Sequence, residues 1–180
     1  MSLSVERQRG ELPDDRRSPA WLTLAAWIAL SAAAGAVGAI ASVNSREFYA
    51  SLERSPWAPP GEVFGPVWTT LYVLMGIAAW LVWRTRPTTT ADRTVRRRAL
   101  TLFVGQLALN ALWTWLFFAW RQGAAAFGEI VLLWIAVALT TWYFGRVRPL
   151  AAYLLVPYLA WVTFATALTW AVWRANPGRL

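Results

Sequence analysis

The chain has 180 residues, of which 58% are apolar and only 14% are charged, whereas ~25% charged residues is typical of globular proteins. It contains no cysteine and no histidine, which excludes disulfides, thiolate nucleophiles, imidazole bases and the usual protein ligands of transition metals. All 17 basic residues are arginines, and because they lie in short connections between apolar segments, they indicate contact with anionic membrane lipid and not with nucleic acid. The composition predicts an integral membrane protein without a metal site or an obligatory cofactor.

Five apolar stretches follow one another along the chain, and each is close to the ~20 residues that a helix needs to cross the hydrocarbon core. They cover residues 20–42, 64–83, 99–120, 124–145 and 149–173. These stretches predict an all-α fold, a single bundle of five transmembrane helices in one domain over residues 20–176. The connections after the third and fourth stretches are so short that the last three helices should be antiparallel neighbours. Residues 1–19 lack apolar periodicity and are expected to form a disordered tail.

The first apolar stretch is rich in small residues. Ser31 and Gly35, like Ala34 and Gly38, have the small-xxx-small spacing that lets a second helix approach closely. That helix could belong to the same bundle or to a second copy of the chain, and packing within the bundle is favoured. The triplet at residues 39–41 also fits a cleavable signal peptide, but the stretch is longer than the usual ~7–15-residue signal core and carries tryptophans near its start, as an anchored helix would.

The arginines are unequally divided between the two sides of this expected bundle. The N-terminal tail, the 84–98 connection and the 146–148 turn hold twelve arginines, whereas the other side holds five. By the positive-inside rule, the N-terminus is expected in the cytoplasm and the loop at residues 43–63 on the outer face. We expect the bundle to lie in a bacterial cell membrane.

The loop at residues 43–63 and the start of the next helix interleave prolines with aromatic residues. They are Pro56, Pro59, Pro60 and Pro66 beside Phe48, Tyr49, Trp57 and Phe64. Proline fixes φ and cannot continue a helix, so this segment is expected to be stiff. Such a loop is either a lid on a cavity or a plug that covers helix ends.

Three of the expected helices carry aromatic or amide side chains at helical spacing on one face. They are Phe64, Trp68 and Tyr72 on the second helix, Gln106, Asn110, Trp113 and Phe117 on the third, and Tyr158, Trp161, Ala165 and Leu168 on the fifth. Each stripe alone is typical of a bundle core, with the amides bonding between helices. At ~1.5 Å per residue, however, Trp68, Trp113 and Trp161 lie at one depth beneath the proline-rich loop. This convergence predicts an aromatic pocket for a flat, largely apolar ligand.

Glu129 is the only acidic residue inside an expected helix. A carboxylate within the membrane is a candidate functional group by default, because an unpaired charge is costly there. The alternative, which we favour, is a structural role in which Glu129 pairs with an arginine such as Arg121 or bonds to a helix terminus.

Four motifs give the chain a resemblance to a known family. They are FYASLERSPWAPP at residues 48–60, FGPVWTTLYVLMG at 64–76, QLALNALWTWLFF at 106–118 and VPYLAWVTFAT at 156–166. With these motifs in order, residues 20–176 of the chain resemble the TspO/MBR family, the tryptophan-rich sensory proteins of bacteria and translocator proteins of mitochondria. Members of this family are five-helix membrane proteins and often dimeric, so the resemblance also implies a homodimer.

The resemblance implies a ligand and a set of pocket residues. Family members bind porphyrins such as protoporphyrin IX, and animal members also bind cholesterol and synthetic drugs. By position, the ligand-binding residues would be Tyr49, Pro59, Phe64, Trp68, Tyr72, Asn110, Trp113, Trp161, Ala165 and Leu168. The macrocycle would stack between the three pocket tryptophans, with Asn110 supplying a hydrogen bond. Because no histidine exists for an axial bond to iron, metal-free porphyrin is favoured over haem.

Three functions fit such a pocket. The first is porphyrin binding for sensing or transport. The second is light- and oxygen-dependent breakdown of porphyrin, in which the resemblance implies a photochemical role for Trp68 and Trp161. The third is a carrier or sensor of sterols, lipids or hydrophobic drugs, whose pocket merely tolerates porphyrins.

Overall fold

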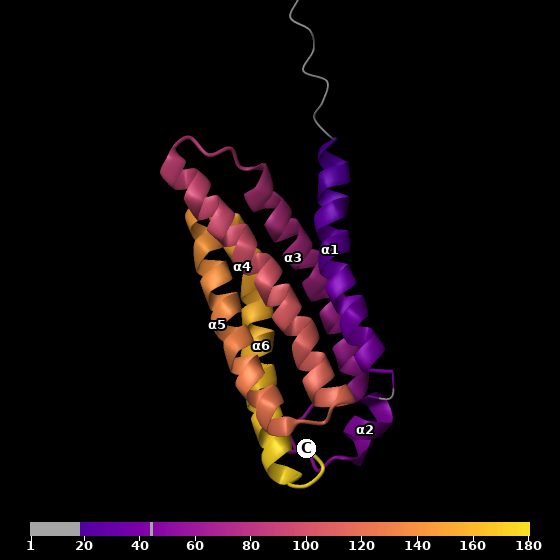
Figure 1. Cartoon of the computed structure of the whole chain (residues 1–180). Coiled ribbons are helices and arrows are strands. Elements are labelled where there is room, and N and C mark those ends of the chain that lie inside the picture. The colour runs from indigo at the N-terminus through magenta and orange to yellow at the C-terminus, as the bar shows by residue number, and fades with distance from the viewer. Residues whose placement is uncertain (1–18, 44) are drawn as a thin grey trace, which may run out of the picture.

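The computed structural model describes residues 19–43 and 45–180, and the expected disordered tail, apart from Pro19, lies outside the described residues. The long helices are α1 (Ala20–Ala41), α3 (Phe64–Arg84), α4 (Thr90–Thr114) with its continuation η2 (Trp115–Ala119), α5 (Gly123–Val147) and α6 (Pro149–Ala175) (Figure 1). These helices give the described chain five segments that are long and apolar enough to cross a membrane. The prediction of an all-α membrane protein with five transmembrane helices is confirmed.

Two short elements connect α1 to α3. They are the helix α2 (Ser45–Ser51) and the 3-10 turn η1 (Gly61–Val63). We call residues 45–63 the cap. Figure 1 shows α2 at the same end of the bundle as the C-terminus and the turn between α4 and α5. We call this end of the bundle the cap end.

Helix α4 begins at Thr90 and not near residue 99, as the apolar pattern alone predicts. A capping box starts it, because the Thr89 hydroxyl accepts a hydrogen bond from the Asp92 N–H at 3.1 Å and the Asp92 carboxylate accepts one from the Thr89 N–H at 3.0 Å. In the first turns of this helix, Arg96 donates to the carbonyls of Trp83 and Thr85, at 2.9 and 3.2 Å. The arginine-rich stretch is therefore helical, and it caps the free carbonyls at the end of α3.

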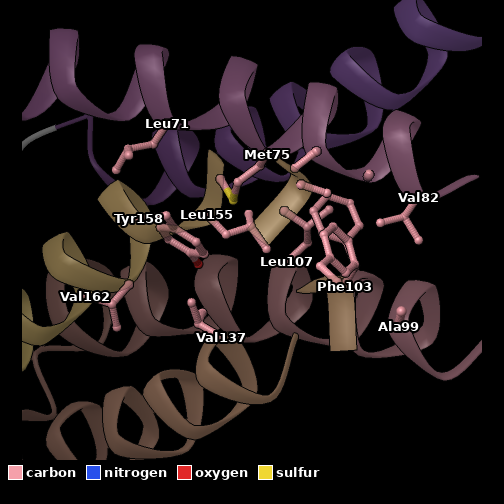
Figure 2. Packing of buried hydrophobic residues seen from close by; sticks show 14 of the residues in the cluster. Leu71, Met75, Val82, Ala99, Phe103, Leu107, Val137, Leu155, Tyr158 and Val162 are labelled. Carbon is pink, nitrogen blue, oxygen red and sulfur yellow. The ribbon is translucent and has the colours of Figure 1, made fainter. Parts of the chain in front are cut away.

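The long helices form a closed ring around a shared core. Around the bundle axis they follow the order α1, α3, α6, α5, α4 and back to α1, so α5 lies between α4 and α6 as the short connections predict. Met75, Phe103, Leu155 and Tyr158 point into this core (Figure 2), and each of these side chains is at most 1% exposed. Phe103 also stacks on Phe144, with ring centroids 5.8 Å apart. The middle of the bundle is thus filled.

The small-residue face of α1 packs within the bundle. A Cβ atom at Gly76 on α3 would come within 2.6 Å of the Ile28 Cα on α1, so the two backbones lie in close contact. Gly38 lies against Thr114 of α4 in the same way, where an added Cβ would be 3.2 Å from the hydroxyl oxygen. Ser31 is fully buried as well. The favoured prediction, that these small residues bring helices of one bundle into close contact, is therefore confirmed.

We expect Gly76→Ala to lower the free energy of unfolding by about 1–3 kcal/mol, because the new methyl group meets backbone atoms that cannot move aside. The matched control is Gly105→Ala on α4, where an added Cβ meets nothing within 4 Å. This control should gain about 0.5–1 kcal/mol from better helix propensity. Thermal unfolding of the two variants in detergent measures both effects, and equal shifts of Tm would contradict the close contact of α1 and α3.

Candidate ligand-binding site

A cavity of about 630 Å³ lies at the cap end of the bundle. All the sequence-predicted site residues except Pro59 and Asn110 line it: Tyr49, Phe64, Trp68, Tyr72, Trp113, Trp161, Ala165 and Leu168. Residues that the sequence did not predict for this site complete the wall, among them Gly35 and Ala36 of α1, Arg46 of the cap, Thr114 of α4 and Thr169 of α6. The described lining residues come from α1, the cap, α3, α4 with η2, and α6, and none comes from α5.

Trp68 and Trp161 form one continuous aromatic wall. The Trp68 ring stacks on Tyr72 with centroids 5.5 Å apart, and its neighbour Trp161 meets it edge to face at 6.5 Å. Trp161 in turn contacts the ring of Phe64 at 5.9 Å. Because Trp68 and Trp161 already touch, the structure has no gap for a flat ring between these two indoles, and the wall presents one continuous aromatic face. Trp113 belongs to the α4 side of the cavity.

Asn110 does not reach the cavity wall but holds a wall residue in place. Its side-chain oxygen accepts a hydrogen bond from the Tyr72 hydroxyl at 2.6 Å, and its side-chain NH₂ donates to the Tyr158 hydroxyl at 3.3 Å. Tyr158 then donates to the side-chain oxygen of Gln106 at 2.7 Å. Both amides are 1% exposed. The expected hydrogen bond from Asn110 to a ligand is thus replaced by an indirect role, since Asn110 fixes the Tyr72 ring at the floor of the cavity.

Two tryptophans of the cavity carry indole N–H groups without a hydrogen-bond partner. The Nε1 atoms of Trp113 and Trp161 are buried, and no described residue accepts a hydrogen bond from them. A buried donor left unpaired costs free energy, about 1–3 kcal/mol. The rings of both side chains line the cavity, but the buried Nε1 atoms are not in contact with its open space.

Glu129 on α5 does not form its expected ion pair. Both carboxylate oxygens are buried and accept no hydrogen bond from a described residue. Arg121 lies instead over the ring of Phe48, with its guanidinium carbon 4.6 Å from the ring centroid. The predicted pairing of Glu129 with Arg121 is therefore wrong. The physical reason is that Arg121 ends the helix with a φ of 55°, in the left-handed region, and directs its side chain to the cap.

A π-helical turn shapes the α4 side of the cavity. In η2 the Trp120 N–H bonds to the Trp115 carbonyl at 2.8 Å, five residues earlier, so the helix widens by one residue per turn. The neighbouring residues Phe117 and Phe118 both line the cavity, and Trp113 stacks on Phe117 with centroids 5.5 Å apart. A prediction from sequence periodicity is based on a regular α-helix, so it could not identify this π-helical turn.

Tyr49 and Pro59 fix the inner face of the cap. The Tyr49 side chain is 4% exposed, and its hydroxyl donates to the Pro59 carbonyl at 3.3 Å. Pro59 thus supports a lining residue without lining the cavity itself. Burial raises the pKa of the Tyr49 hydroxyl, and the nearby Arg54 guanidinium opposes this shift only in part. Tyr49 therefore stays protonated and keeps its donor near neutral pH.

Asn176, just after α6, ties the cap to the C-terminus. Its side-chain oxygen accepts a hydrogen bond from the Glu53 N–H at 2.9 Å, and its NH₂ group donates to the carbonyls of Glu53 and Val172, at 2.9 and 2.8 Å. Arg179 adds hydrogen bonds to the Ser51 carbonyl and hydroxyl, at 2.6 and 3.0 Å. Sequence reasoning missed this latch, because a single asparagine at a helix end is ordinary and its partner is distant in the chain.

We expect Asn176→Ala to loosen the cap, since the backbone N–H and carbonyl of Glu53 then lose their partner. The measurement is the rate at which trypsin cleaves the folded protein after Arg54, an exposed residue of the cap. That rate should rise several-fold, while Gln122→Ala, a change of an exposed amide at the neighbouring turn, should leave it unchanged. Equal cleavage rates in the wild type and Asn176→Ala would show that the latch does not hold the cap.

The comparisons with known proteins agree with this architecture. The sequence profile of the TspO/MBR family matches residues 26–174. Translocator protein of Homo sapiens is 46% identical over 131 residues, which cover 73% of this chain and 76% of that protein. Protein CrtK of Rhodobacter capsulatus is 39% identical over 158 residues, covering 87% of this chain and 95% of that protein. Tryptophan-rich sensory protein of Cereibacter sphaeroides is 35% identical over 159 residues, covering 88% and 94%. The chain therefore belongs to the TspO/MBR family of integral membrane proteins.

Proposed function

We propose that this membrane protein binds a porphyrin, protoporphyrin IX, in the cavity beneath the cap, for sensing or transport. The observation that carries the proposal is the cavity itself, which has about 630 Å³ of space and a continuous aromatic wall of Trp68 and Trp161. This volume lies within the ~300–1,000 Å³ of typical small-molecule sites. A flat macrocycle gains both burial and ring-to-ring contact against such a wall.

The polar groups around the cavity suit the rest of a porphyrin. The exposed Arg46 lies on the cavity rim, where a guanidinium can bind the carboxylates of propionate side chains. Deeper in the cavity, Trp113 and Trp161 offer the faces and edges of their rings, while their indole N–H groups are buried behind the wall. The sequence has no histidine or cysteine, two of the usual axial ligands of haem iron, which favours the metal-free porphyrin over haem.

The proposal also covers the orientation of the protein in the membrane and its oligomeric state. The larger number of arginines at the end opposite the cap supports a cytoplasmic N-terminus and an outward-facing cap in a bacterial cell membrane. We also propose a homodimer. Its contact surface must differ from the small-residue face of α1, because Gly38 of that face is occupied by Thr114 of the same chain.

We expect the wild type to bind protoporphyrin IX saturably and Arg46→Gln to bind it about fivefold more weakly, because an exposed charge pair contributes ~1 kcal/mol. Octaethylporphyrin has the same macrocycle without carboxylates, so its affinity should not change. The matched protein control is Arg174→Gln, which removes an arginine that lies over Trp170, outside the cavity lining. Titration followed by porphyrin absorbance gives all affinities. Equal losses for both porphyrins would show that Arg46 does not bind carboxylates, and a sterol, lipid or hydrophobic drug would then be the better ligand.

Light-dependent breakdown of the bound porphyrin is a second candidate function, favoured by the contact of Trp68 with Trp161 at the cavity wall. An indole against the macrocycle is the nearest electron donor to light-excited porphyrin, and oxygen is the oxidant. With all porphyrin bound, Trp161→Phe should bleach its absorbance several-fold more slowly under light and oxygen than the wild type does. Trp142→Phe changes an indole that is 54% exposed on α5 and should bleach at the wild-type rate. Equal rates in both variants would remove this function.

A further inference from the structure

Helices α1 and α3 pack against each other along a seam, the line of contact between them. Part of this seam is tightly packed and part of it borders the cavity. Away from the cap, the two helices pack tightly, with the Trp80 indole donating to the Thr23 hydroxyl at 3.2 Å and the backbone of Ile28 against Gly76. Gly35 of α1 lies in close contact with the Tyr72 ring of α3. Residues of both helices on either side of this contact line the cavity, from Ile28 to Ala39 on α1 and from Phe64 to Val73 on α3. The cavity therefore extends into this seam.

The exposure of the lining residues shows where the cavity reaches the molecular surface. On the α4 and α6 sides every described lining residue is buried or half-buried. Exposed lining residues come only from α1, the cap and α3. Apart from Gly65 and Pro66 in the first turn of α3, those within the membrane-spanning helices are five apolar or hydroxyl side chains: Ala32, Ala36, Ala39, Thr69 and Val73. We call these five residues the slot. Because the slot is apolar and lies on the outer surface of the bundle, it faces lipid.

The cap restricts the other route, from water. Phe48 and Tyr49 are 8% and 4% exposed beneath it, and Asn176 holds it to the C-terminal segment by hydrogen bonds to both backbone groups of Glu53. Figure 1 shows α2 and the C-terminus together at this end of the bundle, with α1 along one edge. A ligand that entered from water would have to pass the charged rim at Arg46 and Glu62, whereas a ligand in the membrane meets only apolar and hydroxyl side chains at the slot.

We propose that the ligand enters and leaves sideways, from the membrane leaflet on the cap side, through the slot between α1 and α3, while the cap stays latched. The inference rests on the proposed function, since it gives access to the same cavity. The chemistry suits a flat amphipathic molecule that is dissolved in the membrane. Its carboxylates would travel at the level of Arg46 on the rim, and its apolar plane would slide edge-on between the helices.

The first test narrows the slot. Ala36→Trp places a large side chain at an exposed position of the slot, and Ala33→Trp places the same side chain at an exposed position of α1 outside the cavity lining. In lipid nanodiscs, stopped-flow measurement should show protoporphyrin association and dissociation both slowed by about tenfold in Ala36→Trp, so that Kd stays nearly constant. A filled pocket would instead raise Kd. Ala33→Trp should match the wild type. Wild-type rates in Ala36→Trp would overturn the proposal.

The second test locks the cap. The chain has no cysteine, so Glu53→Cys combined with Asn176→Cys allows one disulfide between positions whose groups are in direct contact. The oxidised, locked protein should bind protoporphyrin at the wild-type rate, and reduction should change nothing. Binding that stops when the cap is locked and returns on reduction would establish entry beneath the cap and overturn the slot. If the wild type itself binds no porphyrin saturably, the proposed function fails instead, and the two failures are distinct.

Discussion

A chain of hydrogen bonds across the middle of the bundle determines how three of its helices are placed. Tyr72 of α3, Asn110 and Gln106 of α4 and Tyr158 of α6 bond to one another within the membrane-spanning region. Hydrocarbon offers no alternative partner, so a shift of any of these helices would leave polar groups unsatisfied, at about 1–3 kcal/mol each. These hydrogen bonds also lie between two regions of the bundle. On one side is a filled core around Met75, and on the other is the cavity beneath the cap.

Buried polar groups without hydrogen-bond partners lower the stability of the fold, and the packing of the rest of the bundle offsets this loss. Two indole donors and the carboxylate of Glu129 are buried without partners among the described residues. Native proteins contain few such groups, and they concentrate where function requires them. The two donors belong to Trp113 and Trp161, whose rings line the cavity although their Nε1 atoms are covered by neighbouring atoms. Small residues such as Gly35 and Ala165 leave the space open, and the latched cap covers it at one end of the bundle.

Much of this arrangement could be predicted from the sequence, because lipid imposes simple rules. Apolar length identified five spanning helices, and helical spacing selected Trp68 and Trp161 as residues of one site. The start of α4 was missed because its first turns are polar and are stabilised by the Thr89 capping box, which hydropathy does not register. Asn110 and Asn176 are both held by hydrogen bonds to residues that are distant in the chain, Tyr72 and Glu53 respectively. No spacing rule identifies such partners.

The most direct measurement is to let bound protoporphyrin mark its own surroundings. Under brief illumination in oxygen it generates short-lived oxidants that attack nearby indoles, and mass spectrometry then locates the oxidised tryptophans. If the porphyrin lies in the cavity, Trp68, Trp113 and Trp161 should be oxidised first, and the extent of their oxidation should rise in proportion to the occupancy of the cavity. Oxidation that begins instead at Trp134 and Trp142, which are exposed on α5, and spares the cavity would show that the porphyrin binds elsewhere on the bundle.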